Sequence, residues 1–266
     1  MALDAAIQFA IDFNLHDIAV AANLPIPAEA AALMYGVSAH DIADYQAQID
    51  AQLAQTAAEL ASAPAAQAFL SRFQAGETVL FLGDSITTYR YSYARVLAIL
   101  LAQRGVTAIN RAYSGYTSSH GLELVYISAL GHRPQHVFIS YGVNDCKRFG
   151  GPGHKMLVTE AEYAENMRGI ITAFQGQGAR VTVLSPTLVL EDVVAANEGI
   201  QAMGITWLNT DLHARGDVAG RVAHEAGAGF IDLRGTPPLQ ADLFCADGLH
   251  PNALGEQKML GHILRG

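Results

Sequence analysis

Ser85 is the first residue of this chain whose setting suggests chemistry. It follows the apolar run Val79–Leu82 and the pair Gly83-Asp84, a pattern typical of a buried parallel strand that ends in a turn. In an open α/β sheet, ligands bind at the carboxyl ends of the strands, so a hydroxyl at this point is placed to act as a nucleophile. The same residues would also suit an ordinary turn, in which Asp84 or Ser85 caps the next helix.

A carboxylate and an imidazole stand three residues apart near the end of the chain, in Asp247-Gly248-Leu249-His250-Pro251. Because Pro251 disfavours the interior of a helix, we expect this pair on a loop. There Asp247 can bind one ring nitrogen of His250 while the other nitrogen faces a substrate, as a general base requires. A buried, hydrogen-bonded histidine is the structural alternative.

Two further strand ends carry groups that could donate hydrogen bonds to a ligand. Gly115 follows the second expected strand, and its lack of a side chain would let a backbone N–H approach a ligand closely. Asn144 follows the third expected strand and places a carboxamide there. Each could instead be a loop or turn residue. The presence of polar groups at several strand ends favours a ligand-binding or catalytic site at this edge of the sheet.

These blocks resemble those of the SGNH hydrolases, also called the GDSL esterase and lipase superfamily. In order they are Gly83-Asp84-Ser85-Ile86, Gly115, Gly142-x-Asn144-Asp145 and Asp247-x-x-His250. Ile86 stands where the signature has leucine. The blocks occur in the family's order and at the expected strand ends. The resemblance covers about residues 78–266 and leaves out the first seventy or so.

The resemblance implies that Ser85 attacks an ester carbonyl, that His250 removes and returns the proton, and that Asp247 orients the imidazole. Some relatives orient this histidine partly through a backbone carbonyl, which leaves the role of Asp247 open. The resemblance also implies an oxyanion hole formed by the N–H groups of Ser85 and Gly115 and the side-chain amide of Asn144. It implies no metal and no cofactor.

Four residues near these blocks are candidates for binding the substrate: Asp84, Tyr89, Tyr116 and Phe149. Asp84 adjoins the serine, and the three aromatic residues could line a groove. Because a sugar ring and an acyl chain both pack well on aromatic side chains, these residues do not choose between substrates. Some of them could be ordinary packing residues.

Two other patterns favour no site of their own. His132 and His136 have the spacing of a zinc pair, but Pro134 between them argues against a shared helix face. The glycine-rich loop 149–155 lacks the spacing of a phosphate-binding P-loop, so we predict a mobile flap beside Asn144.

The composition is that of a folded globular protein, with 51% apolar and 15% charged residues among 266. A formal charge of -9 opposes general binding to nucleic acid or anionic membranes. No apolar run is long enough to span a bilayer. The amino terminus lacks the basic residues of a secretory signal, and two cysteines imply no disulfide framework, so a cytoplasmic protein is expected. Whether Cys146 and Cys245 pair is left open.

Strand and helix patterns alternate after Gly76 and predict an α/β fold. The expected strands are 78–82, 106–109, 136–141, 180–184 and 229–233, and the expected helices are 91–104, 119–130, 160–175, two within 191–226 and one from about 252. Short strands separated by helices indicate a parallel sheet covered on both faces. We therefore expect a three-layer α/β/α sandwich with a five-stranded parallel sheet, flavodoxin-like in type.

The first part of the chain, residues 1–75, is rich in alanine and is expected to be a helical segment before a catalytic domain over 76–266. Ser38 and Asp41 predict a capping box at the start of a long helix. This segment could be a stabilising appendage, a lid over the site, or a surface for homo-oligomerisation.

Taken together, the sequence predicts a serine esterase acting on a small-molecule ester, with short acyl esters and O-acetyl groups on carbohydrates as the first choice. A thioesterase or a lysophospholipase would use the same chemistry. A non-catalytic module that binds carbohydrate or peptide on the same fold is the alternative from a different class.

Overall fold

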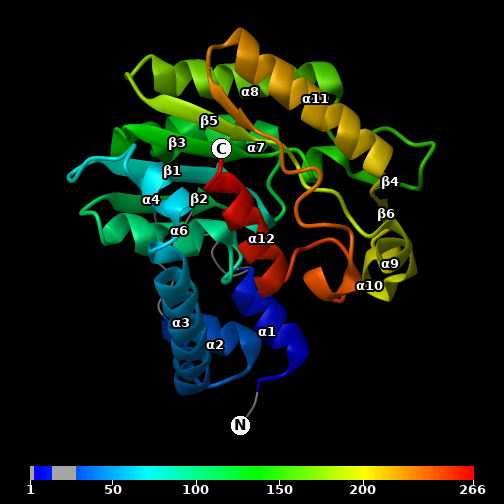
Figure 1. The fold of residues 1–266 in the computed structure, drawn as a ribbon. Coiled ribbons are helices and arrows are strands. Elements are labelled where there is room, and N and C mark those ends of the chain that lie inside the picture. The colour runs from blue at the N-terminus through cyan, green and yellow to red at the C-terminus, as the bar shows by residue number, and fades with distance from the viewer. Residues whose placement is uncertain (1–2, 14–27) are drawn as a thin grey trace.

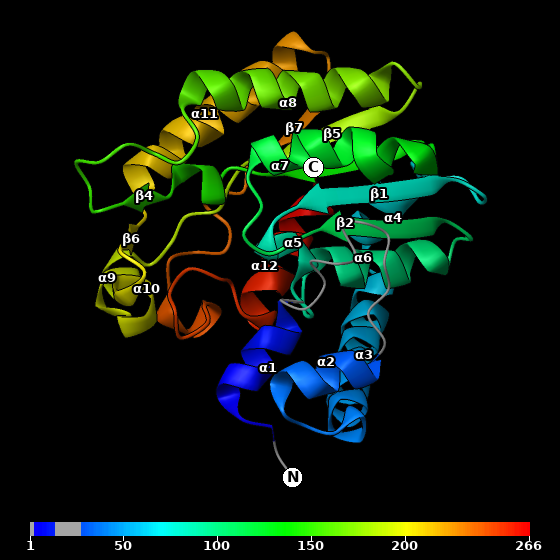
Figure 2. The same ribbon diagram turned by 180° about the vertical axis from the view of Figure 1, so that it is seen from behind.

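The structure, a computed structural model, describes residues 3–13 and 28–266. Its centre is a sheet of five parallel strands in the order β2-β1-β3-β5-β7, which confirms the predicted flavodoxin-like architecture (Figures 1 and 2). The strands are β1 Thr78–Gly83, β2 Thr107–Ala112, β3 His136–Ser140, β5 Arg180–Leu184 and β7 Gly229–Ile231. Since β1 lies between β2 and β3, its carboxyl end is flanked by the ends of both neighbours.

Helices cover both faces of the sheet and make it the middle layer of three (Figure 1). One face carries α6 and α12, and the other carries α7, α8 and α11. Their bounds are α6 Tyr93–Ala102, α7 Ser118–Leu124, α8 Glu160–Gln175, α11 Asn209–Glu225 and α12 Ala253–Ile263. Successive side chains of a strand point to opposite faces, so Val79 and Phe81 of β1 join one buried cluster while Leu80 and Leu82 join the other.

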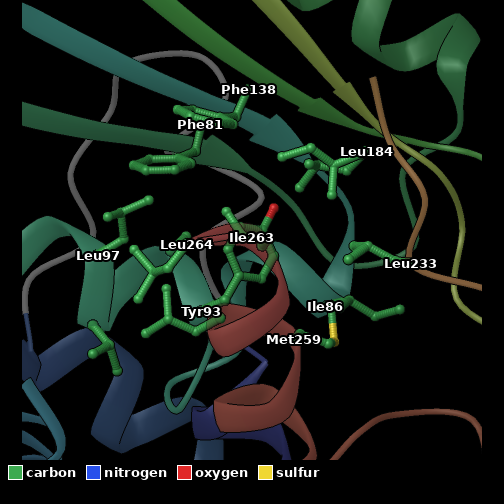
Figure 3. Packing of buried hydrophobic residues seen from close by; sticks show 14 of the residues in the cluster. Phe81, Ile86, Tyr93, Leu97, Phe138, Leu184, Leu233, Met259, Ile263 and Leu264 are labelled. Carbon is green, nitrogen blue, oxygen red and sulfur yellow. The ribbon is translucent and has the colours of Figure 1, made fainter. Parts of the chain in front are cut away.

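Stacked aromatic rings lie at the centre of the first cluster. The ring centroids of Phe81 and Phe138 are 5.4 Å apart, and Figure 3 shows Ile263 and Leu264, at the carboxyl end of α12, below these rings, with Met259 one turn earlier in the helix. All five side chains are buried, and full burial of one such side chain stabilises the fold by about 1.5–3 kcal/mol. This packing fixes α12, and with it the loop that leads into α12, relative to the sheet.

The described part of the amino-terminal segment is helical, as predicted. Its helices are α1 Ala5–Asp12, α2 Ala28–Tyr35, α3 Ala39–Ala61 and α4 Pro64–Leu70. Ser38 Oγ accepts a hydrogen bond from the Asp41 N–H at 3.0 Å, and the Asp41 carboxylate bonds back to Ser38, which confirms the capping box. Leu53 of α3 and Phe69 of α4 lie in the same buried cluster as Phe81. These two helices therefore extend the core of the sheet.

Two of the predicted helical stretches are divided differently. The helix expected over 119–130 ends at Leu124 and continues as a wider, π-helical turn over Val125–Ala129. Three helices rather than two lie within 191–226, because the chain bends at Asn197 and caps a second short helix there. They are α9 Glu191–Ala196, α10 Glu198–Ala202 and α11.

A small antiparallel ribbon, formed by β4 Arg148–Phe149 and β6 Ile205–Thr206, has no counterpart in the prediction. Its strands have two residues each, too few for an alternating pattern. Arg148 is joined to Asp211 of α11 by two hydrogen bonds of 2.7 and 2.9 Å. The loop predicted as a flap therefore begins at an anchored ribbon. Within the described residues, no helix combines the length and apolar character needed to cross a membrane.

Candidate active site

The end of β1 brings Ser85 to the carboxyl edge of the sheet. Gly83 is the last residue of β1, and Ser85 is the first residue of the short helix α5, Ser85–Thr88. Asp84 is the N-cap of this helix, and its carboxylate accepts a hydrogen bond from the Ile86 N–H at 3.1 Å. Asp84 therefore caps the helix, and the hydroxyl of Ser85 is left for chemistry.

His250 approaches Ser85 from the loop before α12. Its Nε2 lies 2.8 Å from Ser85 Oγ, and its Nδ1 lies 2.6 Å from Asp247 Oδ2. Gly248 has a φ of +68°, a conformation that residues with a side chain rarely adopt, and this closes the turn between Asp247 and His250. The three side chains form a continuous hydrogen-bonded chain from a hydroxyl through an imidazole to a carboxylate, the geometry of a catalytic triad.

The surroundings of Asp247 favour its ionised form. Burial opposes ionisation, but the hydrogen bond with the His250 ring and those from the backbone N–H groups of His250 and Leu249 hold the pKa of Asp247 below its usual value. The two backbone bonds, 2.9 and 3.1 Å long, both end on Oδ1, which leaves Oδ2 for the ring. A carboxylate fixed in this way keeps the proton of His250 on Nδ1 and frees Nε2 to accept one.

Gly115 and Asn144 line the same cavity as Ser85. Gly115 has a φ of +80°, so its place in the loop after β2 favours glycine. Asn144 is buried, and its Nδ2 donates a hydrogen bond to the Tyr116 carbonyl at 3.0 Å. An amide nitrogen carries two hydrogens, so this bond orients the amide and leaves a second donor for a ligand.

Asp145, next to Asn144, ties this turn to the helix layer. Its carboxylate accepts hydrogen bonds from the N–H of Ser118 at 3.1 Å and from the Ser118 hydroxyl at 2.5 Å. Asn166 of α8 donates to the same hydroxyl at 3.0 Å. Burial raises the pKa of Asp145 above its usual value, and the bonds from Ser118 counteract that rise. The sequence motif thus contains one residue facing the cavity and one that fixes the turn.

A cavity of about 570 Å³ opens beside Ser85. Besides the residues already named, its walls are mainly apolar: Phe13, Ile200, Met203, Ile205, Trp207 and Leu249. Sequence reasoning missed these residues, along with Lys147 and Asn197, which also line the cavity. Lys147 follows Asn144 by three positions, so closeness to a motif could have identified it. Phe13 lies in the amino-terminal segment, where no motif pointed to it.

None of the four predicted substrate-binding residues is among those that line this cavity, and their role in binding stays a prediction. Asp84 is buried beneath the site as the helix cap. Tyr89 is buried against Phe13, with parallel rings 4.6 Å apart. Tyr116 contributes its carbonyl to Asn144 while its ring stacks on other residues. Phe149 is half exposed on β4. Aromatic residues beside a motif are as useful for packing as for binding, so residue type alone does not identify the residues of the cavity wall.

The two histidines with the spacing of a zinc pair and the two cysteines lie outside this triad. His132 Nε2 accepts a hydrogen bond from Arg111 at 3.2 Å, and His136 Nε2 lies 3.2 Å from the Glu77 carboxylate. Cys146 is buried and Cys245 half buried, and both are free thiols. The structure therefore answers the question of pairing that the sequence left open.

A profile of the GDSL-like lipase/acylhydrolase family matches residues 81–258, which include every block discussed above. Solved structures with a similar fold include an α/β hydrolase, LAE5, from the metagenome of Lake Arreo in Spain, with 20% identity and a TM-score of 0.56 over 72% of this chain and 95% of that one. A lipase/acylhydrolase from Enterococcus faecalis has 22% identity and a TM-score of 0.56 over 71% and 94%. The search of curated proteins found no match.

An acetylxylan esterase from Geobacillus stearothermophilus, Axe2, is also similar: one of its catalytic mutants has 20% identity and a TM-score of 0.57 over 73% of this chain and 94% of that one. In three of its structures a serine, an aspartate or a histidine is replaced by alanine, and each is described as a catalytic mutant. Its aspartate and histidine are three positions apart. At these identities the likeness establishes the fold.

Proposed function

The chain belongs to the GDSL-like lipase/acylhydrolase family, and on that premise we propose that it is a serine esterase that hydrolyses carboxylic esters through an acyl-enzyme. One observation carries the proposal: Ser85 Oγ lies 2.8 Å from His250 Nε2, whose ring is held at Nδ1 by Asp247. A hydroxyl paired with an oriented base is an activated nucleophile. The catalytic serine, aspartate and histidine of Axe2 support the same assignment by analogy.

In the first half-reaction, Ser85 Oγ forms a bond to the ester carbonyl carbon as His250 Nε2 accepts its proton. The N–H groups of Ser85 and Gly115 and the amide of Asn144 stabilise the negative charge that develops on the carbonyl oxygen. The bond to the alcohol oxygen then breaks, and that oxygen takes the proton from His250. Asp247 stabilises the imidazolium that exists between these two proton transfers.

In the second half-reaction, water attacks the acyl carbon and His250 accepts a proton from it. The same oxyanion donors stabilise the second tetrahedral intermediate. The bond between the acyl carbon and Ser85 Oγ breaks, the proton on His250 returns to Ser85, and a carboxylic acid leaves. The chain supplies every proton acceptor and donor that these steps need.

For the substrate, we propose short acyl esters, including O-acetyl groups on carbohydrates. The likeness to an acetylxylan esterase favours the acetyl group. An apolar acyl or alcohol portion would pack against Ile200, Ile205 and Trp207, since burial of apolar surface is favourable by about 25 cal/mol per Å².

A lysophospholipase or thioesterase of the same mechanism is the second candidate, favoured by the size of the cavity. At about 570 Å³ with apolar walls, it has more room than an acetyl group fills. A longer acyl chain would bury more apolar surface there and would bind more tightly. The chain-length preference of the enzyme therefore separates the two candidates.

The test is hydrolysis of 4-nitrophenyl esters from acetate to palmitate by the wild type and by Ser85→Ala. We expect activity that the substitution abolishes, with a preference for short chains. A preference for long chains would replace the acetyl ester proposal with the second candidate.

A fluorophosphonate probe provides a measurement that does not depend on the ester chosen. An activated Ser85 is expected to form one covalent adduct, which mass spectrometry detects and the Ser85→Ala variant lacks. Absence of both labelling and hydrolysis would contradict the esterase and favour a binding module on this fold.

A further inference from the structure

The amino-terminal segment reaches the candidate active site through Phe13. This residue follows the end of α1 and lies outside the residues that match the family. Its ring centroid lies 4.3 Å from that of His250, with the planes inclined by 42°, and 4.6 Å from that of Tyr89, whose ring is nearly parallel to it. Phe13 is 2% exposed and also lines the cavity. Figures 1 and 2 place α1 beside the amino-terminal end of α12, where this contact forms.

The backbone at the end of α1 accepts hydrogen bonds from two other segments of the chain, one near Ser85 and one near Gly115. Arg90 donates from its N–H to the Asp12 carbonyl at 2.8 Å and from its Nε to the Ile11 carbonyl at 3.1 Å. These are carbonyls at the end of α1, which have no partner within the helix. Ser114, the neighbour of Gly115, donates its hydroxyl hydrogen to the Phe13 carbonyl. The segment is thereby attached both to the chain that follows Ser85 and to the loop of the oxyanion donors.

A third attachment joins Asp12 to the long helix α3. The Tyr45 hydroxyl lies 3.0 and 3.2 Å from the two oxygens of the Asp12 carboxylate. Burial raises the pKa of Asp12 to about 6, while the bond from Tyr45 and the charge of Arg90 counteract the rise. Since α3 packs on α6 of the main domain, the end of α1 is fixed to the rest of the fold at several independent points.

We propose that this segment is a built-in part of the active site and that Phe13 is the positioning residue for His250. The proposal rests on the proposed function, because it concerns the same histidine. The ring of Phe13 covers one side of the imidazole, restricts its rotation and keeps water from it. An aromatic ring beside an imidazolium also favours the charged form that appears during the reaction. The wall that Phe13 adds to the cavity would contribute to the choice of substrate.

The test compares Phe13→Leu and Phe13→Ala with Ile7→Ala, a control in the same helix. Ile7 packs against the small cluster of Ile11, Ala32 and Ile42, away from the cavity. We expect Phe13→Leu to lower kcat on 4-nitrophenyl esters by about tenfold, the rate cost of losing roughly 1.4 kcal/mol of transition-state stabilisation. Phe13→Ala should lose more and should also change the chain-length preference. Ile7→Ala should retain kcat, KM and the chain-length preference.

Two measurements distinguish a role of Phe13 in positioning His250 from a role in the stability of the fold alone. The acidic limb of the kcat/KM profile against pH reports ionisation of the free enzyme, and we expect it to move in Phe13→Leu but not in Ile7→Ala. NMR measurement of the exchange of the His250 Nδ1 proton with water reports the shielding of the ring without any substrate, and this exchange should be faster in Phe13→Leu than in Ile7→Ala. Unchanged kcat, pH limb and exchange rate in a folded Phe13→Leu protein would overturn the proposal. A wild type without activity that depends on Ser85 would instead contradict the proposed function, and the NMR result would still decide the role of Phe13.

An independent observation concerns Lys147, a cation in a mainly apolar cavity. Its Nζ lies 5.8 Å from the centroid of the Trp207 ring, and both residues line the cavity. Burial lowers the pKa of Lys147, while the charges of Asp84 and Asp145 counteract this. Those two carboxylates bond to Ile86 and Ser118. Among the described residues, none places a carboxylate oxygen within 4.0 Å of Lys147 Nζ.

The geometry points to a subsite at Lys147 that binds an anionic group of the substrate. Lys147 is three positions after Asn144, the proposed oxyanion donor, and lines the same cavity. An ammonium group that is partly withdrawn from water, and that has no carboxylate beside it in the described part of the chain, can donate a strong, charge-assisted hydrogen bond to a carboxylate or phosphate. The aromatic face of Trp207 holds the cation in the cavity wall. This inference also rests on the proposed function, and it narrows the substrate to esters that carry a negative charge near the scissile bond.

The test uses matched pairs of neutral and anionic esters with the wild type, Lys147→Met and Lys147→Arg. One pair carries the charge on the acyl side, 4-nitrophenyl hydrogen suberate against its methyl ester, and the other on the alcohol side, 4-acetoxybenzoate against its methyl ester. In one of the pairs we expect the wild type to prefer the anion to the neutral ester, and Lys147→Met to lose about tenfold of that preference. Lys147→Arg should retain the preference.

Equal ratios in the wild type and Lys147→Met for both pairs would overturn the subsite and leave the esterase intact. Without any hydrolysis that depends on Ser85, the proposed function fails, and calorimetric binding of suberate and 4-hydroxybenzoate then decides the subsite. Binding that Lys147→Met weakens supports it, and the same or no binding in both proteins contradicts it.

Discussion

The side-chain amide of Asn144 donates a hydrogen bond to the carbonyl of Tyr116 at 3.0 Å. This bond uses one of the two amide hydrogens and sets the direction of the other. The sequence placed both residues at the site but gave Tyr116 a role through its ring. In the structure Tyr116 acts through its backbone, and the residue it orients is the candidate oxyanion donor.

Replacing Asn144 by alanine is expected to lower kcat by about a hundredfold or more, because one donor to the oxyanion is lost. KM should change little, since the oxyanion exists in the transition state and not in the bound ester. Steady-state kinetics on the best 4-nitrophenyl ester would measure both. An Asn144→Ala enzyme with the kcat of the wild type would remove Asn144 from the oxyanion hole.

Ser85→Ala and His250→Ala are each expected to lower kcat by about a thousandfold or more, because the nucleophile and its base act as one unit. For the same reason the double variant should lose little more than either single one. Kinetics and circular dichroism should be compared with those of Ser71→Ala, which removes an exposed hydroxyl far from the site. If the loss of kcat in the double variant were the product of the two single losses, Ser85 and His250 would act independently, which would contradict the proposed mechanism.

The central strands could be predicted because they are buried on both faces. The runs predicted to end at Leu82, Tyr141 and Leu184 are mainly apolar, and the structure places strands there that end at Gly83, Ser140 and Leu184. Their parallel pairing follows from the helices between them. The closeness of Ser85, Gly115 and Asn144 then follows from the topology, since each comes soon after a parallel strand and the carboxyl ends of those strands meet at one edge. His250 reaches this edge from the loop before α12.

The walls of the cavity could not be predicted in the same way. Ile200 and Trp207 come from short helices and a two-residue strand, where the chain is too short to show a period. Phe13 contacts His250 from the opposite end of the chain, and an apolar residue in a helix indicates burial without naming its partner. Tyr89 lies beside a motif, and the structure shows its ring packed on that of Phe13.

Gly83 is required by close packing at the end of β1. A Cβ atom there would lie 2.4 Å from Thr87 Oγ1 and 2.9 Å from the Ser140 carbonyl oxygen. Thr87 cannot turn away freely, because its hydroxyl is 2.9 Å from that of Tyr93. We expect Gly83→Ala to lower the free energy of unfolding by about 1–3 kcal/mol, as overpacking does, and to lower kcat by displacing Ser85.

The matched control for that substitution is Gly131→Ala, whose Cβ would meet no atom within 4 Å. Urea unfolding of both variants measures the difference in stability. If Gly83→Ala were as stable and as active as Gly131→Ala, the close contact at the end of β1 would not constrain the motif.

Asp84 should make the stability of the protein depend on pH. Burial raises the pKa of this carboxyl from 3.8 to about 7, although the hydrogen bond from Ile86 and the charge of His250 counteract the rise. Between about pH 4 and 7 the folded state therefore binds more protons at Asp84 than the unfolded state does, and this group's contribution to stability is lost as the pH rises through 7.

Asp84→Asn keeps an oxygen to accept the Ile86 hydrogen bond but cannot ionise, so its stability relative to the wild type should increase from pH 4 to pH 8. The gain should reach a few kcal/mol at most, at about 1.4 kcal/mol for each unit of pKa shift. Urea unfolding at pH 4, 6 and 8 measures it, with Asp242→Asn as an exposed control. A difference between Asp84→Asn and the wild type that stays constant over this range would mean that Asp84 is ionised throughout. The carboxyl beside the nucleophile would then hold a fixed negative charge, which would favour the imidazolium of His250 at every stage of the reaction.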